Sequence, residues 1–220
     1  MTIPPSPELK QPNLSVGGRG GIMAGIFTSI FIVLILFSYF FLDKKLIIFL
    51  NQYLTAHQIH FFNLISQVGN GLLPAFIFGL GFLICKSLKR LPAQKIFLYL
   101  LSVFIASGLI CDVLKNMLGR ARPELLIHNE LFGFYFFKFH SAYWSFPSGH
   151  STTLGACFMG LFLIFEDFRF KILFLLLGFL ISSCRVLALD HYPSDILAGF
   201  YLGCLTAYFM YPVFFKKLKN

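Results

Sequence analysis

Long uninterrupted stretches of apolar residues run through this chain, and short polar segments separate them. A helix needs roughly 20 predominantly apolar residues to cross a bilayer, and lipid cannot satisfy open backbone groups, so such stretches predict membrane-spanning helices. A membrane β-barrel would instead show short segments of alternating polarity. The pattern therefore predicts an all-α polytopic membrane protein, a helical bundle with six transmembrane helices. The predicted spans are 22–42, 68–85, 96–114, 151–165, 172–189 and 196–215.

The composition supports this prediction. Of the 220 residues, 57% are hydrophobic and 12% are charged, and that charged share is about half the usual one for a soluble domain. A chain this short cannot bury so much apolar surface in one water-soluble core. The same composition excludes a disordered chain, a collagen-like rod and a disulfide scaffold.

The polar segments at the two ends predict tails around one membrane domain. Residues 1–21 are rich in Pro, Gly and Ser and lack periodicity, which predicts a mobile N-terminal tail, and residues 216–220 form a basic C-terminal tail. The six-helix domain then occupies residues 22–215. Its first apolar run is longer than a signal-peptide core of roughly 7–15 residues, so we expect an uncleaved anchor. The mixed segment 51–67 predicts an interfacial helix on the outer side.

The positions of the basic residues predict the topology. The formal net charge is +9, which in a soluble protein would suggest nucleic acid, but here the distribution of the charges is more informative. With six helices and a cytoplasmic N-terminus, 11 of the 18 basic residues fall on the inner side, in agreement with the positive-inside rule. Both termini would then be cytoplasmic, with the lipid bilayer and no nucleic acid as partner. The inner basic residues are Lys10, Arg19, Lys86, Lys89, Arg90, Lys95, Arg169, Lys171, Lys216, Lys217 and Lys219.

The five cysteines indicate packing rather than chemistry. They are odd in number, lie in or at the ends of the apolar runs and share no close spacing, so neither a disulfide framework nor a zinc site is expected. They are Cys85, Cys111, Cys157, Cys184 and Cys204.

Three clusters of polar residues lie at helix ends, where charged groups are costly and usually have a function. The first runs from Lys115 to Pro123, after the third apolar run. The second is the tetrapeptide Pro-Ser-Gly-His at 147–150, before the fourth run. The third comprises Arg185, His191 and Asp195, between the fifth and sixth runs. Counting membrane crossings puts all three clusters on one face of the membrane, the outer face.

Several side chains of these clusters suit a phosphate or another tetrahedral oxyanion. Lys115, Arg122 and Arg185 supply positive charge, and the planar donor groups of the two arginines match phosphate oxygens. Ser148 supplies a hydroxyl donor, and Gly149 lets the backbone N–H groups of a helix start approach an anion closely. We therefore expect these five residues to bind a phosphoryl group.

Two histidines and one carboxylate complete a candidate catalytic set. His191 and Asp195 are four residues apart, so one helical turn brings them within reach of each other. A carboxylate on one imidazole nitrogen fixes the tautomer and raises the basicity of the other, which makes His191 a candidate nucleophile. His150 is a second histidine, free to protonate a leaving oxygen as general acid.

In chain order, the patterns Lys-x6-Arg-Pro from Lys115, Pro-Ser-Gly-His at 147–150 and Arg-x5-His-x3-Asp from Arg185 resemble the motifs of the type 2 phosphatidic acid phosphatase superfamily. Its members include membrane lipid phosphatases, glucose-6-phosphatase and vanadium haloperoxidases. The resemblance implies that His191 attacks phosphorus to form a phosphohistidine and that Asp195 orients His191. By the same resemblance, His150 is expected to protonate the leaving group. It also implies that no metal or other cofactor is needed, because fixed cations neutralise the developing charge. In one departure, Cys184 stands where the family usually has Ser.

The resemblance favours an integral lipid phosphatase of the cytoplasmic membrane, with its active site facing the periplasm or exterior. The substrate stays open among undecaprenyl diphosphate, phosphatidylglycerol phosphate, phosphatidic acid and phosphorylated lipid A. Two other hypotheses are a lipid phosphotransferase that uses the same phosphohistidine and a non-catalytic lipid-binding or transport protein. The oligomeric state is not determined by the sequence.

The roles of Arg120, Asp112 and the loop 131–146 are not determined by the sequence. Arg120 either contacts the substrate or is simply solvated. Asp112 lies one turn before Lys115 and is expected to pair with it in a structural role. The aromatic-rich loop 131–146 either anchors the protein at the bilayer surface or lines a lateral entrance for a lipid tail.

Overall fold

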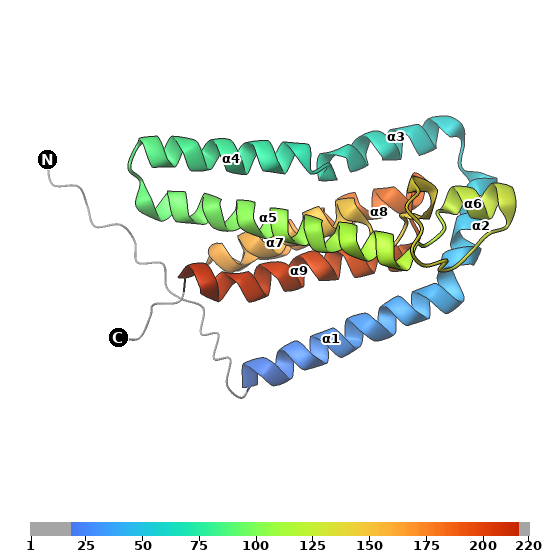
Figure 1. Cartoon of the computed structure of the whole chain (residues 1–220), viewed down its shortest axis with the longest axis horizontal. Coiled ribbons are helices and arrows are strands. Elements are labelled where there is room, and N and C mark those ends of the chain that lie inside the picture. The colour runs from blue at the N-terminus through green and yellow to red at the C-terminus, as the bar shows by residue number, and fades with distance from the viewer. Residues whose placement is uncertain (1–18, 216–220) are drawn as a thin grey trace, which may run out of the picture.

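The computed structural model describes residues 19–215, and they form a bundle of helices without a β-sheet (Figure 1). This confirms the predicted all-α class. The helices are α1 (Arg19–Phe37), α2 (Asp43–Tyr53), α3 (Ala56–Ser66), α4 (Leu72–Ser87), α5 (Leu91–Leu118), α6 (Pro123–Asn129), α7 (Gly149–Ile164), α8 (Phe168–Leu187) and α9 (Pro193–Phe215). The short helical turns are η1 (Ser38–Leu42), η2 (Gln67–Gly69) and η3 (Ser141–Tyr143).

The two predicted tails fall almost entirely outside the described residues. Of the predicted tail residues, 1–18 and 216–220 lie outside the described part of the chain. The helix α1 begins at Arg19, which is within the predicted N-terminal tail. The helix thus begins three residues before the predicted boundary at residue 22, and the division into tails and membrane domain stays a prediction.

Within the described part of the chain, five helical segments are long and apolar enough to cross a membrane. The sixth predicted span corresponds to α7, an apolar helix of 16 residues, so the predicted count of six holds only when this shorter helix is included. The chain is a multi-pass membrane protein. The five longer segments are Gly25–Tyr53, Ala56–Ser87, Leu91–Leu118, Phe168–Leu187 and Pro193–Phe215.

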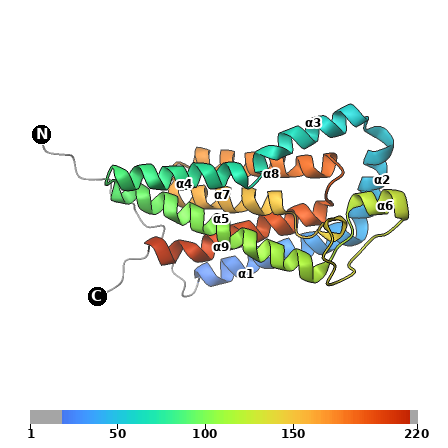
Figure 2. The same cartoon turned by 45° about the horizontal axis from the view of Figure 1, so that its top comes forward.

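The second span departs most from its predicted boundaries. The chain turns after α2, and Thr55 caps α3 by accepting a hydrogen bond from the Gln58 N–H at 3.3 Å. From there α3 leads through η2 into α4 with a bend between the two helices, and α3 packs against α8 (Figures 1 and 2). The helix predicted over 51–67 is broken at residues 54–55, between α2 and α3, and its interfacial position stays a prediction. Polar residues such as Asn63 suggested a water-facing segment, but they point to partners inside the bundle.

Glycines set the distance between α7 and α9, the pair of helices that pack most extensively against each other (Figure 1). A Cβ atom at Gly155 would lie 2.2 Å from the carbonyl oxygen of Phe200, and one at Gly203 would lie 2.2 Å from that of Thr152. Ordinary van der Waals contacts begin at 3.4 Å, so only glycine fits at these positions. Small residues at helix interfaces are typical of membrane bundles, where close backbone approach drives association.

The outer surface of the bundle is apolar, as a lipid environment requires. Large side chains of α1, α4 and α8 point outward, including Val33, Leu83 and Leu180, each at least 60% exposed. In water such a continuous apolar surface would cause aggregation, whereas lipid tails cover it without cost. The polar groups of the protein are correspondingly gathered at the two ends and inside the bundle.

Candidate active site

The three motif clusters lie together at one end of the bundle. The end of α5, the start of α7 and the junction between α8 and α9 all occur at this end, where the loop after α6 also folds over the helices (Figures 1 and 2). The alternating direction of the long helices produces this arrangement. The prediction that segments distant in sequence meet is borne out at one end of the bundle, while the side of the membrane that this end faces stays a prediction.

Lys115 lies directly against the start of α7. A Cβ atom at Gly149 would be 2.9 Å from the Lys115 ammonium nitrogen, so the absence of a side chain at Gly149 lets the cation approach the backbone there. Lys115 also lies 3.9 Å from Asp112, whose side chain is 72% exposed. The expected pairing of these two residues is present, but an exposed pair of this kind is worth only about 0–1 kcal/mol.

Ser148 occupies a buried position between α7 and α9. Its backbone N–H donates to the Asp195 carbonyl at 3.1 Å, and its hydroxyl accepts a hydrogen bond from Ser151 at 3.2 Å. The Ser148 side chain is fully buried, and its predicted role as a hydrogen-bond donor to phosphate stays a prediction.

Arg122 and Arg185 approach each other across one carboxylate. Asp190 lies 3.9 Å from the Arg122 guanidinium and 3.1 Å from that of Arg185. In addition, Arg185 donates to Asn63 and Ser66 of α3, each at 3.2 Å. The Nε atoms of both arginines are buried without a hydrogen-bond partner in residues 19–215, so each retains a donor for an oxyanion.

The environment of His191 defines its tautomer. Its Nδ1 atom lies 2.8 Å from the Ser145 carbonyl oxygen and 3.6 Å from an Asp195 carboxylate oxygen. Because a carbonyl only accepts, Nδ1 carries the proton and donates it to Ser145, and Nε2 keeps its lone pair. The Asp195 carboxylate lies at ion-pair distance from the ring, whereas the acceptor of the Nδ1 hydrogen bond is a backbone carbonyl of the aromatic loop. The sequence did not indicate this carbonyl.

His191 is neutral near pH 7. Burial lowers the pKa of the imidazole to about 4, and the positive charges of Arg122 and Arg185 act in the same direction against the opposing effect of Asp195. A neutral imidazole with its Nδ1 proton engaged has a nucleophilic Nε2 available at physiological pH.

Asp195 is fully buried and held from several sides. It accepts hydrogen bonds from the Ser145 hydroxyl at 2.6 Å and from the Tyr192 N–H at 2.8 Å, and its other oxygen forms an ion pair with Arg120. A carboxylate with this many donors stays in place beside the imidazole. Ser145 thus contacts both members of the His191–Asp195 pair, through its carbonyl and its hydroxyl respectively.

Arg120 is not in contact with solvent, so the interpretation that it is simply solvated is wrong, and its side chain is engaged by carboxylates of the protein. It is fully buried and bridges Asp195 to Asp43, which lies 2.7 Å away at the start of α2. Burial by itself would lower the pKa of this guanidinium, but the two carboxylates outweigh it and raise the pKa. The Ser194 hydroxyl, which Arg120 contacts at 2.7 Å, also bonds to Asp43.

The aromatic loop encloses this ion-pair network. Aromatic rings lie 4.4–5.9 Å from the Arg120 guanidinium, a range in which cation–π attraction operates. Part of loop 131–146 therefore packs inward, which neither predicted role foresaw, while Phe137 and Phe139 stay exposed. The rings are Tyr39, Phe132, Phe134, Phe146 and Tyr192.

His150 lies in the first turn of α7, within the electrostatic influence of the same group of charges. Lys115, Arg122 and Arg185 act on it, as does His191. On its other side, a Cβ atom at Gly69 would lie 3.4 Å from the His150 Cβ, so the break between α3 and α4 borders this histidine. All eight predicted site residues thus gather at one end of the bundle.

Residues that the sequence reasoning missed hold this set in place: Asp43, Asn63, Ser66, Ser145, Asp190 and Ser194. The sequence position of Asp43, directly after the apolar run 22–42, could have indicated that its carboxylate has a charged partner. Cys184 contributes nothing here, since its thiol is directed to the Leu180 carbonyl of its own helix. No group of three or more metal-ligating side chains occurs within residues 19–215.

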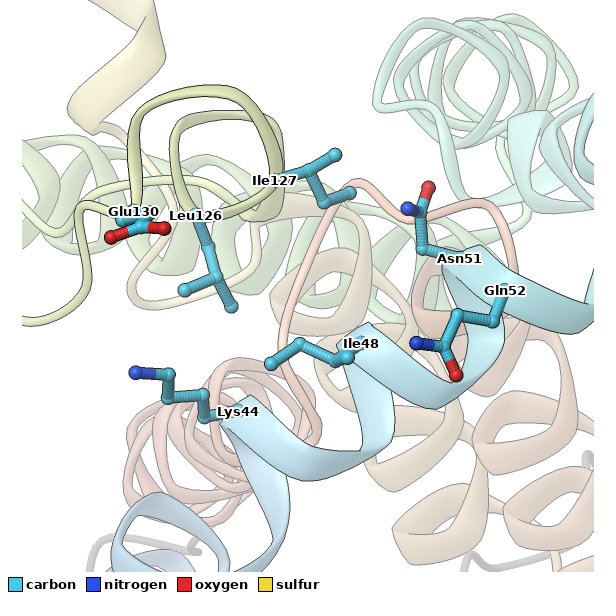
Figure 3. A pocket seen from close by; sticks show the side chains of 7 residues that line it. All are labelled: Lys44, Ile48, Asn51, Gln52, Leu126, Ile127 and Glu130. Atoms are coloured by element: carbon cyan, nitrogen blue, oxygen red, sulfur yellow. The ribbon is translucent and has the colours of Figure 1, made fainter.

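A separate cavity of about 400 Å³ lies between α2 and α6 (Figure 3). Lys44 and Glu130 face it from opposite sides, and its apolar wall includes Leu126, which belongs to the same hydrophobic cluster as Tyr192. None of the predicted site residues lines this cavity, so it is separate from the candidate active site.

Comparisons with known proteins agree with this geometry. A sequence profile of the PAP2 superfamily matches residues 96–219, more than half of the chain. Lipid A 1-phosphatases of Rhizobium etli and Rhizobium johnstonii are 41% and 42% identical over 105 residues, which are 48% of this chain and 44% and 42% of those proteins. Phosphatidylglycerophosphatase B of Bacillus subtilis is 32% identical over 134 residues, 56% of this chain and 60% of that protein.

A solved structure shares the fold. The crystal structure of Aquifex aeolicus LpxE superposes with a TM-score of 0.57 at 20% identity, over 78% of this chain and 96% of that one. The matched region spans less than half the length of the two lipid A 1-phosphatases.

Proposed function

Because the chain belongs to the PAP2 superfamily, we propose that this multi-pass membrane protein is a metal-independent phosphatase that removes phosphate from a membrane lipid. The observation that carries the proposal is the hydrogen bond from His191 Nδ1 to the Ser145 carbonyl at 2.8 Å. It leaves Nε2 unprotonated beside two arginines that retain free donors. Such a nitrogen, next to groups that bind phosphoryl oxygens, is equipped for attack on phosphorus.

The first step forms a phosphohistidine. Nε2 of His191 attacks phosphorus as the bond to the lipid oxygen breaks, and His150 gives that oxygen its proton. His191 becomes positively charged through the new N–P bond, and the buried Asp195 stabilises that charge at 3.6 Å. Lys115, Arg122 and the other phosphate-binding groups neutralise the charge on the equatorial oxygens, the main requirement of phosphoryl transfer.

The second step hydrolyses the intermediate. His150, now deprotonated, takes a proton from water as the water attacks phosphorus, and the N–P bond breaks to return His191 to its neutral form. The Ser145 carbonyl holds the Nδ1 proton throughout, so the same nitrogen is regenerated for the next cycle. A phosphotransferase would differ only in using a lipid hydroxyl in place of water.

The names of the relatives guide the choice of substrate. Two similar proteins are lipid A 1-phosphatases and one is a phosphatidylglycerophosphatase, which supports a lipid phosphate presented at a membrane surface. The lipids to be tested as substrates are therefore lipid A and phosphatidylglycerol phosphate, together with undecaprenyl diphosphate and phosphatidic acid. We further propose a location in the cytoplasmic membrane, with both termini inside and the site outside.

Phosphate release in detergent from this lipid panel tests the function. We expect release without an acceptor lipid and in the presence of chelator, since the fixed cations supply the positive charge. His191→Ala should abolish it, whereas His57→Ala, an exposed histidine of α3, should not change it. Brief reaction with ³²P-labelled lipid should give an acid-labile phosphoenzyme that His191→Ala lacks. A wild-type protein that releases phosphate from no lipid, or only with added magnesium, would refute the proposal.

The topology has its own test. In intact cells, a membrane-impermeant thiol reagent should label Phe139→Cys in the exposed part of the aromatic loop, but not Leu91→Cys at the opposite end of the bundle. The reverse labelling pattern would show that the site faces the cytoplasm.

A further inference from the structure

Asp190 is the one carboxylate among the described residues that lies against both phosphate-binding arginines. It lies 3.1 Å from the guanidinium of Arg185 and 3.9 Å from that of Arg122, and it is 29% exposed. The mechanism above does not use it. The other carboxylates of the site differ, because Asp43 and Asp195 are fully buried and paired with Arg120.

The position of Asp190 has two consequences for an incoming phosphate. Its negative charge reduces the positive potential around the two arginines, and its carboxylate oxygens lie at ion-pair distance from both guanidinium groups, where oxygens of a second phosphate would otherwise be attracted. A single phosphoryl group can still be bound, because the Nε donors of both arginines are buried and unpartnered in the described chain. A diphosphate brings at least one more negative charge into the same space, and Asp190 repels it.

We propose that Asp190 is a specificity-determining residue that makes the site favour lipid phosphomonoesters over lipid diphosphates. This inference rests on the proposed phosphatase function and selects among its candidate substrates. Two unit charges about 8 Å apart at an effective dielectric constant of about 20–80 interact enough to change a rate constant by roughly 2- to 30-fold. Because Asp190 is partly exposed, we expect a value toward the lower end, about 3- to 10-fold.

The test compares two substrates with the same tail, an isoprenoid monophosphate and the corresponding diphosphate, in detergent. For each protein, kcat/KM is measured on both lipids and the ratio is the readout. Asp190→Asn should raise the diphosphate-to-monophosphate ratio about 3- to 10-fold, and Asp190→Glu, which keeps the charge, should leave it near the wild-type value. Glu166→Gln is the control for loss of a carboxylate and should leave the ratio unchanged, because this exposed residue lies between α7 and α8, at the opposite end of the bundle.

The outcomes separate the inference from the function on which it rests. An Asp190→Asn ratio equal to that of the wild type, or an equal change on both lipids, would overturn the specificity role and leave only positioning of the arginines. If Asp190→Asn does not fold, inhibition of the wild type decides: inorganic phosphate should inhibit more strongly than pyrophosphate, and the opposite order refutes the inference. A wild type inactive on both lipids and on the wider panel argues against the phosphatase function itself.

Discussion

Gly199→Ala is expected to disable the site through a displacement of α7 rather than through any lost chemical group. Gly199 lies one turn after Asp195 on α9, and a Cβ atom there would be 2.4 Å from the Ser148 carbonyl oxygen. An ordinary contact of 3.4 Å therefore requires the two backbones to separate by about 1 Å. The neighbouring atom is backbone at the start of α7, so no flexible side chain can move aside.

The displacement falls on the groups that must act together. Ser148 donates its N–H to the Asp195 carbonyl, and His150 follows two residues later on the same helix. A misplacement of about 1 Å in an active site can cost on the order of 100-fold in rate. Overpacking of a tight helix interface also costs about 1–3 kcal/mol in stability. We therefore expect kcat/KM for phosphate release to fall about 100-fold, with a lower Tm.

The assay is phosphate release in detergent together with thermal unfolding, with Gly108→Ala as the matched control. Gly108 lies in α5, and a Cβ atom there meets nothing within 4 Å. The control should keep full activity and a Tm equal to or above that of the wild type, because alanine favours the helix by about 0.5–1 kcal/mol. If Gly199→Ala matches Gly108→Ala in both measurements, the α7–α9 contact does not position the site.

Three further outcomes follow from the site geometry. The ¹⁵N signals of His191 should report half-protonation near pH 4 rather than 6.5. Between these two pH values the unfolded chain binds a proton at His191 that the folded protein does not, so the free energy of unfolding should decrease as pH falls from about 6.5 to 4. A midpoint near 6.5 would contradict the buried, neutral imidazole. Asp43→Ala removes one partner of a buried arginine and should cost about 3–5 kcal/mol together with most activity, and an unchanged Tm would argue against the network. Asn63→Ala with Ser66→Ala removes two acceptors of Arg185 and should lower kcat/KM about tenfold, mainly by raising KM; an effect on Tm alone would assign α3 a purely structural role.

The sequence by itself determined the membrane class and most of the spans, and it predicted which residues gather at the candidate site. Apolar runs predict spanning helices because lipid allows few other structures, and the number of crossings puts the three motif clusters at one end. Lys115, His150 and His191 could be recognised because charged or titratable residues at helix ends are costly and their spacing is local. The second span was misjudged where Asn63 and Ser66 interrupt the apolar pattern, since a local pattern does not distinguish a polar residue facing water from one facing Arg185.

Only the tertiary structure decided how the catalytic groups are held. Arg120 meets Asp43 across 77 positions of the chain and Asp195 across 75, and Arg185 meets Asn63 across 122. Helix packing determines which charged residues pair in the interior, because a buried charge without a partner is costly once lipid and protein exclude water. No periodicity along the chain encodes such partners, and the tautomer of His191 depends on the carbonyl of a loop that folds back from elsewhere.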